Sequence, residues 1–571
     1  MSQMLVSIYF QVIGSGVGGL TSANILSRFG YRVAVFEQHY TVGGSTHTYH
    51  AKTTKDDDSG GKLDFEFDVG VHYVGGQMDR WNSAIRWLFN WLSDGKLEWS
   101  KIDEVYDVTY NCETGQRIEF VGDHRQNHQT ILKQFPSLDP RALDLYKKKC
   151  RRARLVSYLA FALKVLPPVF LKACWIGLGW LYRHYCLGKT YDVMKSCGLP
   201  DDVIGALTYS YGDYGTPPSK SPFFIHAFME CHYEGGGFFP KGGSSSIAKT
   251  LVAAIQRRGG QVFAAAPIDK IMTSATCCGG YKATGVIVKG VEIRARKGVI
   301  SDAGFTRTFD MANGRLPLVD PVAGGHQLAL VHPTESTPPF SPSFAFFYLF
   351  IGLDGTDQEL GLKGQNVWHV ANWNHDKNAR DLFAAANMEE ALDVPPPLVF
   401  LSNESAKDPD FGSRCPGKST VTMIVWTDAR WFDAYKNTTH ADRGESYQRA
   451  KDKMTRTMLN VLYIHFPLTL GHVVFSELGT PLSANKYLGR TAGEIYNLDH
   501  TEERFQTLNT QLALHPQTTV RNLYLTGQDV MAVSIIGATL SGCFTASRVS
   551  TVVLLAAAIP VAFLCLPWAV S

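Results

Sequence analysis

The chain has 571 residues, of which 45% are hydrophobic and 19% are charged, and its formal net charge is only +3. A chain of this length needs more than one compact core, so two or more lobes are expected. The small net charge gives no sign of a nucleic-acid partner. The 11 cysteines form no CxxC pair, which argues against both a disulfide framework and a structural metal site.

The first motif is a glycine-rich turn near the start of the chain, with the sequence GSGVGG. The apolar stretch 8–13 precedes it, a helical pattern follows at 20–29, and a second apolar stretch, 31–36, ends on Glu37. A dinucleotide-binding unit has this order of elements: strand, glycine turn, helix, strand and acidic residue. This turn therefore predicts a nucleotide site.

Each glycine of this turn has a physical task. Gly14 allows the tight turn, Gly16 lets the backbone approach a pyrophosphate, and Gly19 lets the helix pack close to the strand. The helix N-terminus offers free N–H groups to phosphates. We expect Glu37 to accept hydrogen bonds from ribose hydroxyls.

Further segments of nucleotide-binding type occur in the middle and at the end of the chain. After a mostly helical stretch at 80–232 come a glycine-rich return at 235–243, a helix at 244–258 and a strand at 261–266. A hairpin turns at Lys289-Gly290, a strand at 298–304 ends in a glycine turn, and a late strand at 522–529 precedes a helix at 535–549. These patterns predict an α/β fold with a discontinuous Rossmann-type nucleotide-binding domain, which the family resemblance described below makes an FAD-binding domain, and an inserted α+β domain, expected to bind substrate and membrane. The expected boundaries are 1–80, 235–310 and 480–550 for the first domain, 81–234 and 311–479 for the second, and 551–571 for a hydrophobic tail.

Two segments suggest contact with a membrane. Residues 145–191 contain no Asp or Glu, are rich in Lys and Arg, and have an apolar, Trp-containing middle. Pro167-Pro168 would break a single spanning helix, so we expect this segment to lie in a membrane interface, although a buried helical hairpin would also explain it. The stretch 549–570 is almost wholly apolar and long enough to span hydrocarbon, which predicts a C-terminal anchor or a last packed helix.

A resemblance to a known family narrows the choice of nucleotide. It rests on VIGSGVGGLTSANILSRFGYRVAVFEQHYTVGGSTHTY (12–49), FDVGVHYVGG (67–76), FFPKGGSSSIAKTL (238–251), GTPLSANKYLGRTAGEIYNLDHT (479–501) and LYLTGQDVMAVSIIGATLSG (523–542). With these segments the chain resembles the retinol saturase and carotenoid isomerase–phytoene desaturase family of FAD-dependent oxidoreductases. The resemblance implies tightly bound FAD and a polyene lipid substrate.

The same resemblance implies further cofactor-binding residues. Gly43, Gly44 and Ser45 match a loop that passes the pyrophosphate and ribityl chain, and Ile268 matches an adenine contact. Gly527 and Asp529 match a strand tip that reaches the flavin phosphate and ribityl end, and Ile536 and Gly537 match a helix N-terminus near the flavin pyrimidine edge.

The resemblance implies reduction of a retinoid or carotenoid C=C bond, such as saturation of all-trans-retinol. His72 and Tyr73 follow a strand that should end near the flavin, so either could supply the proton, or both could only brace the flavin loop. No second GxGxxG motif occurs, so NADPH or NADH is expected only as a transient electron donor. A location at the endoplasmic reticulum membrane is expected.

Other functions stay open at this stage. A polyene desaturase or cis–trans isomerase would use the same scaffold, an amine oxidase would share the FAD site, and a non-enzymatic lipid-binding escort protein would use a related fold. The sequence does not decide the oligomeric state.

Overall fold

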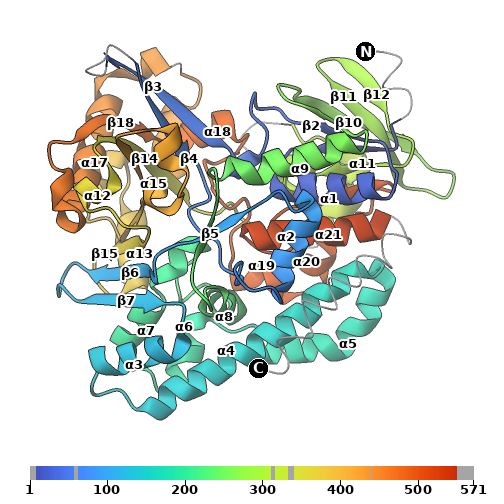
Figure 1. The fold of residues 1–571 in the computed structure, drawn as a ribbon. Coiled ribbons are helices and arrows are strands. Elements are labelled where there is room, and N and C mark those ends of the chain that lie inside the picture. The colour runs from blue at the N-terminus through green and yellow to red at the C-terminus, as the bar shows by residue number, and fades with distance from the viewer. Residues whose placement is uncertain (1–7, 57–61, 310–315, 332–339, 439, 550–571) are drawn as a thin grey trace.

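A five-stranded parallel sheet joins distant parts of the chain (Figure 1). The computed structural model describes residues 8–56, 62–309, 316–331, 340–438 and 440–549. The sheet has the order β19-β13-β1-β2-β9. Its strands are β1 (Phe10–Ile13), β2 (Val33–Phe36), β9 (Gln261–Phe263), β13 (Gly298–Ser301) and β19 (Leu523–Leu525). The predicted α/β fold with a Rossmann-type sheet is confirmed, whereas the domain boundaries stay a prediction.

Both faces of this sheet are covered. On one face α1 (Val17–Arg28) crosses from β1 to β2 and packs against α9 (Ser245–Arg257) and α21 (Ile535–Val549). On the other face lies an antiparallel sheet of β10 (Ile268–Ala275), β11 (Tyr281–Val288) and β12 (Val291–Arg294). Ile271 and Val286 of this small sheet share a hydrophobic cluster with Ile13 and Phe36. The hairpin expected at Lys289-Gly290 is the β11–β12 turn.

A seven-stranded sheet forms the centre of the second lobe, in the order β18-β14-β17-β16-β15-β6-β7. Only the β15–β6 pair is parallel; the other pairs are antiparallel. Its strands are β6 (Val105–Asn111), β7 (Arg117–Val121), β14 (Ala345–Asp354), β15 (Asn366–Val370), β16 (Leu398–Ser402), β17 (Lys418–Thr427) and β18 (Val473–Gly479).

The interpretation of residues 80–232 as mostly helical is wrong for the first part of that stretch. β5 (Trp99–Lys101) pairs with β8 (Phe238–Pro240), and β6 and β7 form a hairpin at the edge of the large sheet. The parallel partner of β6 is β15, more than 250 residues away, so local periodicity could not reveal it. Helices follow: α3 (His124–Gln134), α4 (Pro140–Ala162), α5 (Pro168–Tyr185), α6 (Thr190–Lys195), α7 (Asp201–Leu207) and α8 (Phe223–His232).

The remaining strands and helices complete the two lobes and the segments between them. They are β3 (Thr48–Asp56), β4 (Lys62–Asp68), α2 (Ala84–Ser93), α10 (Phe305–Phe309), α11 (Pro321–Leu328), α12 (Asp357–Leu360), α13 (His375–Ala384), α14 (Met388–Ala391), α15 (Glu404–Lys407), α16 (Phe411–Arg414), α17 (Gly444–His465), α18 (Pro481–Tyr487), α19 (Glu502–Gln506) and α20 (Leu508–Ala513). Short 3-10 turns include Leu163–Val165 and Tyr209–Asp213.

Helices α4 and α5 form a hairpin at one edge of the molecule (Figure 1). As expected, the chain breaks at Pro167-Pro168, and α5 begins at Pro168. Lys164, counted among the basic residues of this segment, is instead buried and donates to the carbonyl oxygens of Leu514 and Val530. Among the described residues, no helix combines the length and the apolar character that crossing a membrane requires. The hydrophobic tail, 551–571, lies outside the described residues.

Candidate active site

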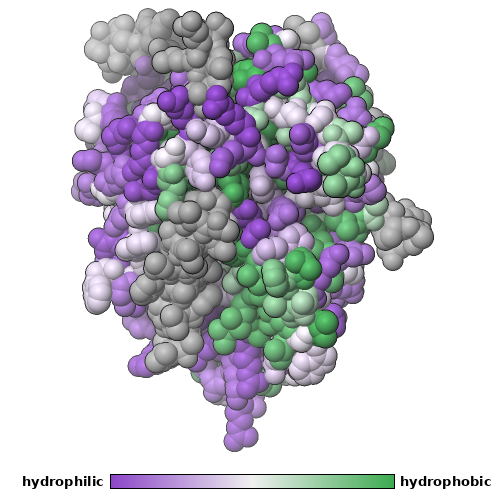
Figure 2. Space-filling view, turned by 90° about the vertical axis from the view of Figure 1, so that its right-hand side faces the viewer, coloured by the Kyte–Doolittle hydropathy of each residue, from purple (hydrophilic) through white to green (hydrophobic). Residues whose placement is uncertain are grey.

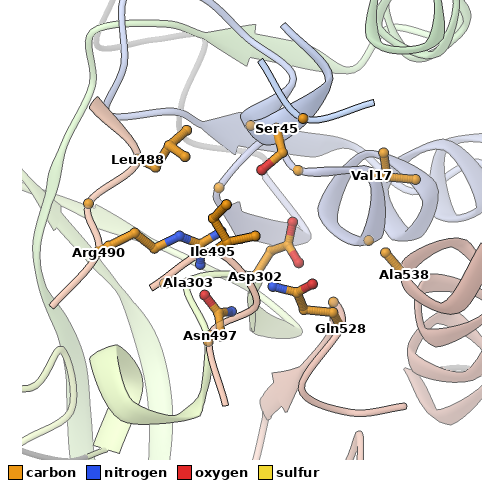
Figure 3. Close-up of a pocket in the computed structure, with 18 of the residues that line it drawn as sticks. Val17, Ser45, Asp302, Ala303, Leu488, Arg490, Ile495, Asn497, Gln528 and Ala538 are labelled. Carbon is orange, nitrogen blue, oxygen red and sulfur yellow. The ribbon is translucent and has the colours of Figure 1, made fainter. Parts of the chain in front are cut away.

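The glycine turn after β1 forms one wall of a large cavity (Figure 3). Gly14 has a φ of 91°, which favours glycine, and α1 begins directly after Gly16. A Cβ on Gly19 would lie 2.4 Å from the Gly14 carbonyl oxygen. Gly14 and Gly16 line the cavity, whereas Gly19 lies behind it and lets the helix approach the turn.

Glu37 lies at the end of β2 and is almost fully buried. Its Oε2 accepts hydrogen bonds from Ser15 N (2.9 Å) and Ser15 Oγ (2.6 Å), and its Oε1 accepts one from His39 N (2.8 Å). The carboxylate thus fixes the glycine turn and still borders the cavity. Its oxygens retain lone pairs that can accept from a ribose hydroxyl.

The loop after β2 packs directly on the turn. Gly43 N donates to Ser15 Oγ at 2.9 Å. Gly43 and Gly44 have φ values of 121° and 55°, and a Cβ on Gly44 would lie 3.2 Å from Gly16 Cα. Gly43, Gly44 and Ser45 all line the cavity. Two glycine segments therefore make a narrow cradle that any larger side chain would fill.

The late strand tip after β19 contributes Gly527 and Asp529 to the same cavity. A Cβ on Gly18 would lie 2.6 Å from Gly527 N, so the tip closely approaches the start of α1. Asp529 accepts hydrogen bonds from Phe305 N (2.8 Å) and Leu498 N (3.4 Å). Asp529 thereby connects three chain segments. The ribityl contact expected of it would be additional to these hydrogen bonds. Ile268 lies in the cavity wall as well.

Asp302, which the sequence analysis did not single out, lies at the centre of this cavity (Figure 3). Its Oδ2 accepts a hydrogen bond from Gly19 N at 3.0 Å, at the N-terminus of α1. Burial, together with the charges of Glu37 and Asp529, raises its pKa to about 7. An acid directly after a strand that pairs with β1 was the signal that could have revealed it.

Arg490 brings a positive charge to the opposite wall (Figure 3). Its Nε is buried and has no hydrogen-bond partner among the described residues. A guanidinium is suited to bind phosphate oxygens. The glycine cradle, the helix N-terminus and this unpartnered donor together fit a dinucleotide with an anionic diphosphate.

A second cavity adjoins the first and is mostly apolar and aromatic. Their shared wall consists of Gly70, Val71, His72, Tyr496, Val533, Ser534 and Ile535. Ile536 and Gly537, expected near the flavin, line the second cavity. Ser534 has a φ of 120°, and its Oγ accepts from Gly537 N at 2.9 Å, which caps the start of α21. No role for residues 533–535 was apparent from the sequence; they separate the two cavities.

His72 and Tyr73 lie in this region with different surroundings. His72 Nδ1 is 3.0 Å from Glu404 Oε1, and its buried Nε2 has no partner among the described residues. Tyr73 lines only the second cavity, and its hydroxyl lies within hydrogen-bond distance of Asp107 and Asp213. Whether either acts in catalysis stays a prediction.

The fold and the paired cavities define a Rossmann-type oxidoreductase. A model for an NAD(P)-binding Rossmann-like domain matches residues 12–86. The chain is 31% identical to the all-trans-retinol 13,14-reductase of Danio rerio over 94% of its own length and 85% of that protein. Identity to the human protein of that name is also 31%, over 92% of this chain and 83% of that one. The chain belongs to the all-trans-retinol 13,14-reductase family.

More distant proteins share the fold. A prolycopene isomerase of Daucus carota is 23% identical over 84% of this chain and 70% of its own. An oxidoreductase from Methanosarcina mazei superposes with a TM-score of 0.54 at 16% identity, covering 94% of this chain and 99% of its own. Cyclohexylamine oxidase from Brevibacterium oxydans gives 0.54 at 14% identity, covering 98% and 99%. At these identities the solved structures support the fold alone.

Proposed function

We propose that this protein is an FAD-dependent oxidoreductase that reduces a C=C bond of a polyene lipid, with all-trans-retinol or a related retinoid or carotenoid as substrate. The observation that carries the proposal is the pair of adjoining cavities, one built from glycine turns and one mostly apolar. The names of the 31% identical relatives support the choice of retinol.

The cofactor would be held by residues of the first cavity. Gly14, Gly16, Gly43 and Gly44 leave room for a pyrophosphate, Arg490 would bind its oxygens, and Glu37 would accept from ribose hydroxyls. When bound, the flavin supplies two-electron hydride transfer. The chain's own task is to position the polyene beside it and to exclude water.

The shared wall of the cavities is where substrate and cofactor would meet. The Glu404 carboxylate, 3.0 Å from His72 Nδ1, fixes the orientation of the imidazole and leaves Nε2 for another partner. Tyr496 and Ile535 border both cavities and would confine the polyene. Of the phenylalanines in α8, Phe228 lines the second cavity, whereas Phe223 and Phe224 belong to the core.

A spectrum of the purified protein tests the cofactor, and its reduction tests the reaction. We expect oxidised flavin absorbance, released as FAD on denaturation. Anaerobic NADPH or NADH should bleach it, and added retinol should restore it. A protein without flavin would contradict the proposal and would favour a lipid-binding escort role.

Isomerisation, desaturation and amine oxidation are the alternative reactions, and each leaves a different product. The prolycopene isomerases among the relatives support a redox-neutral isomerase as the second candidate. Isomerisation would leave the substrate's mass unchanged, and desaturation would remove two hydrogen atoms. Oxidation of amines, as in the structurally similar putrescine oxidase, would release hydrogen peroxide.

We also propose that the exposed face of α5 lies on a membrane, in keeping with the expected location at the endoplasmic reticulum. Large apolar side chains are exposed there: Val169, Phe170, Ile176, Trp180 and Leu181. Figure 2 shows a hydrophobic area low on this side of the molecule. Lys172 and Arg183 of α5 are exposed beside it and would attract anionic lipids.

A further inference from the structure

Two carboxyl groups flank one tyrosine hydroxyl in the wall of the second cavity. Tyr73 Oη lies 3.0 Å from Asp107 Oδ2 and 3.2 Å from Asp213 Oδ2. Asp107 belongs to β6 and is fully buried. Asp213 ends the 3-10 turn Tyr209–Asp213 and lines the cavity.

A count of protons shows that one of these carboxyl groups is neutral. Asp107 Oδ2 also contacts Tyr209 Oη at 2.9 Å, and Asp213 Oδ2 also contacts Tyr233 Oη at 3.5 Å. Tyr73, Tyr209 and Tyr233 carry one hydroxyl proton each. Tyr73 has one proton for two carboxyl groups, so both of its contacts are hydrogen bonds only when one of these groups carries an O–H and donates to Tyr73 Oη.

The surroundings assign that proton to Asp213. Asp107 accepts hydrogen bonds from Tyr209 and, through Oδ1, from Asn366 Nδ2 at 3.0 Å. Bonds of this kind favour a charged carboxylate. Lys407 Nζ donates to Asn366 Oδ1 and so brings a positive charge to the same side. Burial raises the pKa of Asp107 only to about 7, because the hydrogen bonds from Asn366 and Tyr209 oppose it. Burial, and then the charge of Asp107, raise the pKa of Asp213 well above its ordinary value.

The protonated carboxyl group faces space that a ligand can enter. Both contacts of Asp213 are made through Oδ2, and none of the described residues donates to Oδ1. Nearby in the wall of the same cavity, the buried Nε2 of His72 also has no partner among the described residues. Asp213 and His72 therefore each offer one polar atom to this mostly apolar cavity that no described residue pairs with.

We propose that Asp213 is the catalytic acid of this cavity and gives its proton to a carbon of the polyene, with Tyr73 and Asp107 as positioning residues. The proposal rests on the proposed reduction. One carbon of the C=C bond receives a hydride, with its two electrons, from the reduced flavin cofactor. The other carbon receives the proton from Asp213: the O–H turns from Tyr73 Oη toward the cavity, and the O–H bond then breaks. Asp213 remains as a carboxylate and regains a proton from water after the product leaves.

Asp213→Asn is the direct test, because the amide keeps the size of the side chain and a donor toward Tyr73 Oη but has no proton to transfer. We expect flavin content and retinol binding, measured by quenching of protein fluorescence, to be unchanged. The rate of retinol reduction should fall at least 10²-fold, a loss typical for removal of a general acid. Asp123→Asn, at the exposed N-cap of α3, is the matched control and should retain the full rate.

Infrared spectroscopy gives a readout that does not depend on turnover. At neutral pH the carbonyl band of protonated carboxyl groups should be weaker in Asp213→Asn than in the wild type, by the share of one carboxyl group, and unchanged in Asp123→Asn; the half-protonated Asp302 contributes equally to all three proteins. If the wild type reduces no polyene but shows this difference in intensity, the proposed function fails while the protonated acid stands. A band of undiminished intensity in Asp213→Asn, or reduction at the wild-type rate by that variant, would overturn the inference.

Tyr73→Phe tests the positioning role. Phenylalanine keeps the ring stack on Tyr233, whose centroid is 4.4 Å away, but removes the hydroxyl between the two acids. We expect kcat to fall about tenfold with KM unchanged. A change confined to KM and thermal stability would instead show that Tyr73 only supports the cavity wall.

Discussion

At the scale of single residues, glycines and acids determine the chemistry of the first cavity. The glycines predicted from the turn and the loop line the cavity, except Gly19, which acts behind it. The acids Glu37, Asp302 and Asp529 are all close to the phosphate-binding end of α1. The cavity thus combines a cradle for an anion with three carboxyl groups.

Gly18→Ala should separate the start of α1 from the late strand tip. The new Cβ would meet Gly527 N at 2.6 Å, a backbone atom that cannot rotate away. We expect the purified variant to lose most of its FAD, measured as flavin absorbance per protein. Gly325→Ala, a helical position with nothing within 4 Å of the new Cβ, should retain it; equal flavin content in both variants would contradict this prediction.

Asp302 should make cofactor binding dependent on pH. Its pKa of about 7 means that it becomes negative as pH rises through neutrality, next to the helix N-terminus that would receive the diphosphate. FAD affinity should therefore fall from about pH 6 to about pH 8, by roughly tenfold, and Asp302→Asn should abolish this fall. Titration of apoprotein with FAD at several pH values measures it. If FAD affinity still falls with rising pH in Asp302→Asn, a group other than Asp302 causes the pH dependence.

The same group affects stability in the opposite sense to most acids. The pKa of Asp302 is higher in the folded than in the unfolded protein, so the folded state holds this proton more tightly. Its contribution favours folding at low pH and decreases as pH rises from about 4 to about 7. Asp302→Asn should remove this part of the pH dependence of the apoprotein's melting temperature.

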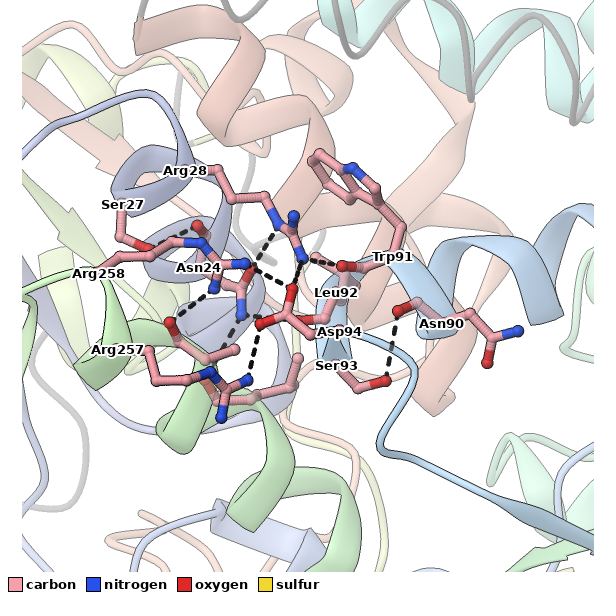
Figure 4. Close-up of polar contacts among 12 residues, drawn as sticks. Asn24, Ser27, Arg28, Asn90, Trp91, Leu92, Ser93, Asp94, Arg257 and Arg258 are labelled. Carbon is pink, nitrogen blue, oxygen red and sulfur yellow. Dashed lines mark hydrogen bonds and ion pairs between the residues drawn. The ribbon is translucent and has the colours of Figure 1, made fainter.

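At the scale of elements, α2 is held against α1 and α9 by a carboxylate among arginines (Figure 4). Asp94 follows α2 in the left-handed conformation, with φ 56°. It pairs with Arg28, Arg257 and Arg258. These cations hold the pKa of Asp94 at about 2.

Asp94→Asn should lower the free energy of unfolding by about 1 kcal/mol, a value reduced for the partial exposure of the pair. Asparagine also adopts the left-handed conformation, so the backbone is preserved. Because the folded pKa lies below the unfolded one, this contribution is present above about pH 4 and is lost as pH falls toward 2. Urea unfolding of the wild type and the variant at pH 7 and pH 3 checks the sign of this pH dependence. An equal loss of unfolding free energy at both pH values would contradict the prediction.

The α5 surface gives a second prediction at this scale. Ile176 is 84% exposed, so Ile176→Glu should leave the fold intact while weakening binding to anionic liposomes about tenfold. Val322→Glu, on a side chain that is 71% exposed on α11, is the control. Flotation with liposomes measures both. Equal binding by the two variants would exclude α5 as the membrane-contacting surface.

Local pattern predicted some elements and missed others. The helix expected at 535–549 is α21, and the β1–α1–β2 unit follows the glycine pattern. The place of β6 in the seven-stranded sheet was missed because its parallel partner, β15, is more than 250 residues away. The sequence did not reveal the roles of Asp302, Arg490 and Asp213. Each role depends on neighbouring residues that only the tertiary fold brings close. Lys164 was misinterpreted because a buried lysine bonded to carbonyl oxygens looks, in sequence, like any basic residue.

At the scale of the whole molecule, segments that are far apart in the chain lie side by side in the five-stranded sheet (Figure 1) and line the first cavity, which the second cavity adjoins. Family membership alone does not guarantee turnover, since a Danio rerio relative 28% identical to this chain is named an inactive all-trans-retinol 13,14-reductase. Activity must therefore be measured on this protein.

The most direct measurement is mass analysis of all-trans-retinol after anaerobic incubation with the FAD-loaded protein and a chemical reductant. We predict a product heavier by two hydrogen atoms, with both of them derived from solvent when the reaction runs in deuterium oxide, because the N–H groups of a reduced flavin and the carboxyl proton exchange with the medium. Recovery of retinol with its mass unchanged, or of a product lighter by two hydrogen atoms, would contradict the assignment as a polyene reductase.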